Sequence, residues 1–68
     1  MVVTTQVRMA NEIAAQFRHL SHEAAVSAVA GHLRSFWEPR MRAQLLEQVA
    51  AGGEGIDPLV REAVAQLP

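Results

Sequence analysis

The sequence predicts an all-α fold, a small bundle of four short helices that makes one domain of residues 1–68. Apolar residues recur at spacings of three and four in four separate segments, and no segment alternates in the manner of a strand. Proline, glycine and capping side chains separate the four segments. Alanine, the residue with the highest helix propensity, occurs twelve times. The predicted helices cover about residues 5–19, 22–37, 39–51 and 58–67.

The first two helices are predicted from their apolar stripes, after a loose end at residues 1–4. The stripe of the first helix is formed by Val7, Ala10, Ile13, Ala14, Phe17 and Leu20. Ser21 is a favourable N-cap for the second helix. Its stripe is formed by Val26, Val29, Ala30, Leu33 and Trp37, widened by Ala25 and Phe36. Gly31, in the middle of this helix, is either simply tolerated or lets another backbone approach closely.

A corner is predicted between the second and third helices. Pro39 disfavours the helical conformation for the residue before it and suits the first position of a new helix. Glu38 is therefore expected to be the N-cap of the third helix, although its spacing from Ser35 also fits a capping box. The third helix is stopped by Gly52 and Gly53.

The fourth helix is predicted to start at Asp57-Pro58, an N-cap followed by a proline at the first helical position. Its stripe is formed by Val60, Ala63, Val64 and Leu67. The glycine-rich segment before it does not follow a strand and lacks the spacing of a phosphate-binding loop.

The corner is also the candidate interface. Phe36 and Trp37 either fill the core or anchor a partner, because tryptophan and arginine are frequent at binding hot spots. Arg42 lies on the apolar arc of the third helix, between the directions of Val49 and Leu46. It either extends to water along its aliphatic stem or reaches a carboxylate on another chain. The interface candidates are Phe36, Trp37, Pro39, Arg40, Met41 and Arg42.

No catalytic, cofactor-binding or metal site is expected in this chain. It has no cysteine, and its three histidines are His19, His22 and His32. Ser21 is expected to break the helix between the first two histidines, and no third ligand is near them in sequence. The carboxylates are not paired at the spacing of a general acid and base. The sequence therefore argues against an enzyme in its own right.

Composition limits the other function classes. A chain of 68 residues is marginal as an isolated domain, and its alanine-rich core favours stabilisation by a partner chain. The net charge of −1 argues against nucleic-acid binding, although a helix-turn-helix module reading DNA through Arg40 and Arg42 remains the alternative. No apolar run approaches the length of a membrane span, and the N-terminus lacks a secretory pattern. The expected location is the cytoplasm.

Three motifs are distinctive: Arg8–Ala14 (RMANEIA), Phe36–Arg42 (FWEPRMR) and Gly52–Val60 (GGEGIDPLV). In this order and at this separation they resemble the delta subunit of bacterial NAD-dependent, molybdenum-containing formate dehydrogenases. The resemblance extends over about residues 7–65. Glu38 stands where aspartate is more usual in the family, a departure that leaves the cap role intact.

The resemblance implies a non-catalytic accessory subunit. In this family the large alpha subunit oxidises formate at a bis-molybdopterin guanine dinucleotide molybdenum centre. Electrons pass through iron–sulfur clusters to a flavin (FMN) subunit that reduces NAD. The delta subunit is associated with assembly or stability of the complex and carries no cofactor. The expected partners are thus the large catalytic subunit and, through it, the flavin and iron–sulfur subunits, without nucleic acid or membrane.

Overall fold

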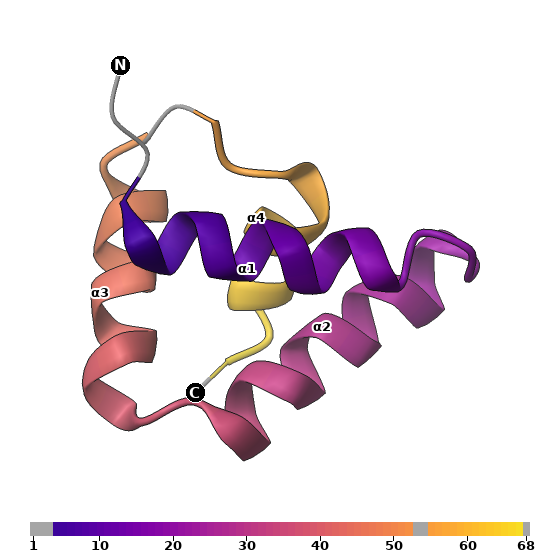
Figure 1. Cartoon of the computed structure of the whole chain (residues 1–68), viewed down its shortest axis with the longest axis horizontal. Helices are drawn as coiled ribbons and strands as arrows, with labels where there is room; N and C mark the ends of the chain where they lie inside the picture. The colour runs from indigo at the N-terminus through magenta and orange to yellow at the C-terminus, as the bar shows by residue number, and fades with distance from the viewer. Residues whose placement is uncertain (1–3, 53–54, 68) are drawn as a thin grey trace.

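A computed structural model describes residues 4–52 and 55–67, and these residues form four helices and no strand. The helices are α1 (Thr5–Gln16), α2 (His22–Phe36), α3 (Pro39–Ala50) and α4 (Pro58–Val64). Figure 1 shows α1 crossing the molecule between α3 at one end and α2 at the other, with α4 behind it. The predicted all-α fold is confirmed. No helix in the described ranges is long and apolar enough to span a membrane.

The helices start where the sequence predicts, and capping side chains fix the first turns of α1, α2 and α4. Ser21 accepts a hydrogen bond from the Ala24 N–H (3.3 Å), and Asp57 accepts one from the Leu59 N–H (2.9 Å). Residues 1–3 of the predicted loose end lie outside the described residues. Thr4, the fourth of them, is the N-cap of α1, and its hydroxyl accepts a hydrogen bond from Val7.

Two helices end three residues earlier than predicted. The α1 helix stops at Gln16 instead of residue 19, and α4 stops at Val64 instead of residue 67. In both places the chain continues in tighter turns, in which an N–H bonds to the carbonyl three residues back, as in Leu67 to Val64 (3.1 Å). The apolar spacing continues through such turns, so it does not mark where a helix ends. The α2 and α3 helices are each one residue shorter than predicted.

The core is formed by all four helices in very unequal shares. The buried apolar residues are Val7, Ala10, Ile13, Ala14, Ala25, Val26, Val29, Ala30, Leu33, Trp37, Leu45, Ile56, Leu59, Val60, Ala63 and Val64. The α2 and α4 helices form the most extensive contact, and α1 touches each of the other three helices. A methyl group built on Gly31 would meet nothing within 4 Å, so no backbone approaches it closely within the described chain.

Candidate protein interface

The corner between α2 and α3 has the predicted backbone. Trp37 is the C-cap of α2, and its N–H donates to the Leu33 carbonyl (3.2 Å). Glu38 is the N-cap residue of α3 in an extended conformation, with Pro39 at the first helical position. The Glu38 side chain makes no capping hydrogen bond. Proline geometry, rather than a capping box, therefore starts α3.

The two neighbouring aromatic residues have opposite environments. Trp37 is only 6% exposed and belongs to the core. Phe36 is 76% exposed, although the sequence places it on the apolar stripe of α2. Its ring lies 4.8 Å from the ring of His32, one turn earlier, at an interplanar angle of 41°. Of the predicted aromatic pair, Phe36 is thus the ring available to a partner.

Arg42 stabilises the end of α2 from the first turns of α3. Its Nη1 donates to the carbonyls of Leu33 and Arg34, each at 3.3 Å, and to that of Trp37. These carbonyls lie in or next to the last turn of α2, where intrahelical N–H partners run out. A cation at a helix C-terminus also opposes the negative end of the helix dipole. Arg42 therefore binds backbone carbonyls of its own chain. The sequence suggests either water or a carboxylate of another chain as its partner.

The remaining candidates divide between surface and core. Pro39 and Arg40 are exposed, whereas Met41 is half-buried against the core. Every residue from 34 to 40 except Trp37 is exposed. We call these exposed residues the corner surface: Arg34, Ser35, Phe36, Glu38, Pro39 and Arg40. That the corner binds a partner stays a prediction.

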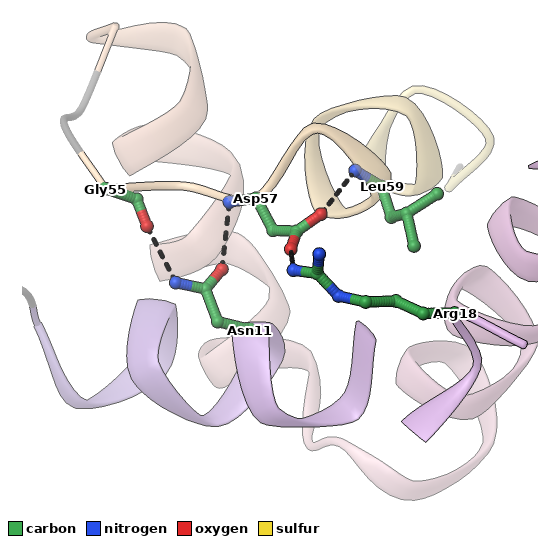
Figure 2. A network of polar contacts seen from close by, with 5 residues as sticks. All are labelled: Asn11, Arg18, Gly55, Asp57 and Leu59. Carbon is green, nitrogen blue, oxygen red and sulfur yellow. Dashed lines mark hydrogen bonds and ion pairs between the residues drawn. The ribbon is translucent and has the colours of Figure 1, made fainter. Parts of the chain in front are cut away.

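A polar network that the sequence analysis missed holds the α3–α4 connection against α1 (Figure 2). Asn11 donates from Nδ2 to the Gly55 carbonyl (2.7 Å), and its Oδ1 accepts the Asp57 N–H (2.9 Å). The Asp57 carboxylate caps α4 and also pairs with Arg18, which follows the end of α1. The Asp57 side chain is only 7% exposed, against 62% for Arg18. One signal was available: Asn11 is a poor helix former in the middle of a predicted helix.

The three histidines do not form a cluster. His22 pairs with Glu62 across α2 and α4 (2.6 Å), and both side chains are at least half exposed. His19 is exposed and His32 lies beside Phe36. Within residues 4–52 and 55–67, no three potential ligands from histidine, cysteine, aspartate and glutamate come together. The His22–Glu62 contact borders a surface depression of about 390 Å³, lined by His22, Glu23, Val26, Ser27, Glu62 and Gln66.

Comparison with known proteins identifies one family. A family model described as the delta subunit of NADH-dependent formate dehydrogenase, FdsD, matches residues 6–64. No curated protein and no solved structure matches the chain. The matched range contains α2, α3, α4 and all of α1 except Thr5, and it covers most of the 68 residues. It also contains the three motifs that resemble this family. The chain therefore belongs to the FdsD family of formate dehydrogenase delta subunits.

Proposed function

We propose that this chain is a non-catalytic accessory subunit that docks on the large catalytic subunit of formate dehydrogenase and supports assembly or stability of the complex. The observation that carries the proposal is the match to the delta-subunit family over residues 6–64. The exposed ring of Phe36 gives the domain a side chain suited to a partner. We place this function in the cytoplasm.

The polar side chains support a structural role. Asn11, Arg18 and Asp57 hold the α3–α4 connection, and Arg42 caps α2. Each of these groups is engaged within the chain. Catalysis requires a nucleophile or an acid–base pair that converges on a substrate position. These side chains instead make hydrogen bonds and an ion pair that stabilise the fold.

The cofactors of the complex belong to the other subunits in this proposal. Iron–sulfur clusters are held mainly by cysteine thiolates, and this chain has no cysteine. The clusters are thus assigned to the other subunits. The family resemblance assigns the bis-molybdopterin guanine dinucleotide molybdenum centre, FMN and NAD to the large subunit and to the flavin and iron–sulfur subunits that it connects.

The contacts of Arg42 count against the DNA-binding alternative, in which Arg40 and Arg42 would contact the DNA. A reading helix needs its arginines free to reach base edges or phosphates. The Arg42 guanidinium instead donates to two carbonyls of α2 and to that of Trp37, the C-cap of α2. Arg40 would remain as the one exposed cation in the first turn of α3.

The test is a pull-down of the tagged chain from its native host, with molybdenum analysis of the eluate. We expect the large subunit and molybdenum to be recovered with the chain. Deleting the chain should lower formate-dependent NAD reduction in the extract, and a plasmid copy should restore it. Recovery of the chain alone, together with unchanged activity in the deletion strain, would contradict the proposal. Retention on DNA that decreases with added salt would support the alternative instead.

A further inference from the structure

We propose that the corner surface is the docking site, with Phe36 inserted into an apolar pocket of the partner that is rimmed by carboxylates. The inference rests on the proposed function, because the partner is taken to be the large catalytic subunit. It goes beyond that function by naming the surface, the anchoring side chain and the chemistry of the partner's site.

The direction of Phe36 is the first reason. At about 100° per residue, Phe36 points within about 20° of both Ala25 and Val29 on α2. Those two residues are buried, at 1% and 0% exposure, whereas Phe36 is 76% exposed. The apolar stripe of α2 thus continues to Phe36, beyond the residues of the stripe that the other described residues bury. An exposed phenyl ring that continues a buried stripe fits a second surface that extends the core.

Charge is the second reason. Residues 32–46 contain three of the six arginines and a single acidic residue, Glu38, whereas the rest of the chain has three arginines and six acidic residues. Arg42 is used within the fold, whereas Arg34 and Arg40 are exposed, Arg40 in the first turn of α3 and Arg34 about 160° around α2 from Phe36. An excess of positive charge around this corner, in a chain of net charge −1, is complemented by carboxylates on a partner, and arginine binds these in a bidentate manner.

The same charges disfavour a second copy of this chain as the occupant. In a two-fold symmetric contact the same patch serves both subunits. Each copy would then bring the same excess of positive charge to the contact, two exposed arginines against one Glu38. A different chain with an acidic rim avoids this repulsion. The excess of positive charge at the corner therefore favours a heterologous partner over a second copy.

The experiment compares tagged full-length variants expressed in the native host, each measured as large subunit recovered per tagged chain. Phe36→Ala should reduce recovery about thirty-fold, because truncating a binding anchor typically has this effect. Arg40→Glu should reduce it about ten-fold, and the loss should shrink as salt is added. Leu20→Ala and Arg8→Glu are the matched controls, because both residues are exposed and lie outside residues 34–40. Their recovery should stay within two-fold of wild type.

Circular dichroism of each purified variant completes the test, and we expect all four spectra to match the wild type. If wild-type chain recovers no large subunit, both the proposed function and this inference are overturned. If wild type recovers it and Phe36→Ala does so equally well, only this inference is overturned. Sedimentation showing a wild-type dimer that Phe36→Ala converts to monomer would assign the surface to a second copy, which also overturns it.

Discussion

The α2–α4 pair and α3 are built from similar amphipathic sequence but are held very differently. Four of the seven residues of α4 are buried, and five residues of α2 are buried. Of the twelve residues of α3, only Leu45 is buried, while Met41, Leu46 and Val49 are half-buried. The main contact of α3 is with α1, whereas α2 and α4 also pack on each other. An apolar stripe therefore predicts a helix but not how firmly that helix is held.

This difference predicts unequal local stability. Segments with few buried contacts open at lower free energy than the core around them. Beyond its half-buried face, α3 is held by Leu45, by the Arg42 cap on α2 and by an exposed Gln6–Gln44 hydrogen bond. The corner surface lies where the firmly packed part meets the lightly packed one.

Truncation in the α2–α4 core should have the largest effect. Leu33 is fully buried, and replacing a buried leucine by alanine costs about 2–5 kcal/mol. A domain of this size has a total stability of only about 3–10 kcal/mol. Leu33→Ala should therefore unfold much of the population in a single transition, monitored by urea titration of helicity and Trp37 fluorescence. Full retention of the wild-type midpoint would contradict the assigned core.

The same substitution in α3 should act more locally. Leu45 is equally buried, and Leu45→Ala should cost about 2–3 kcal/mol. We expect amide exchange in α3 to accelerate while α2 and α4 keep most of their protection, since Leu45 is the only fully buried residue of α3. Uniform acceleration in all four helices would show that the two parts unfold as one unit.

Arg42→Met should destabilise the fold by about 2 kcal/mol, because hydrogen bonds to a charged group contribute about 1.5–3 kcal/mol. Methionine keeps the apolar stem and removes the donors. Thermal unfolding measures the loss, and Arg40→Met is the matched control, expected within about 0.5 kcal/mol of wild type. Equal stability of the two variants would show that the contacts with the Leu33, Arg34 and Trp37 carbonyls contribute nothing measurable.

Asn11→Ala should cost about 1–2 kcal/mol. The change leaves the Gly55 carbonyl and the part-buried Asp57 N–H without the amide that pairs with both. Chemical denaturation measures the loss, and hydrogen exchange should show it concentrated in the α3–α4 connection. Ala15→Gly is a useful comparison, because it lowers helix propensity in α1 without touching the network; loss of protection in the connection in that variant too would contradict the assignment to Asn11.

The smallest effect is expected at the His22–Glu62 contact between α2 and α4. His22 and Glu62 are at least half exposed, and exposed pairs contribute about 0–1 kcal/mol. His22→Gln should therefore leave the unfolding midpoint nearly unchanged, even though it lies in the firmly packed part. A loss comparable to that of Arg42→Met would mean that this surface contact, rather than buried area, joins α2 to α4.

Local chemistry was enough to predict the helices and their starts. Ser21, Asp57 and Pro39 act on residues within one turn of themselves, so their effect can be recognised without knowing the fold. The α1 and α4 helices end three residues before their predicted ends, because apolar spacing continues through the tighter turns that close them. The family was also recognisable, because its motifs are local strings of residues.

Only the tertiary structure decided which side chains are buried and which are free. Phe36 and Trp37 are adjacent on the chain, yet one is exposed and the other is core, because burial depends on where the covering elements end. Arg42 found its partner five to nine residues back across a corner, and Asn11 found its partners more than forty residues away. Such pairings depend on the relative placement of helices, which periodicity along a single helix does not specify.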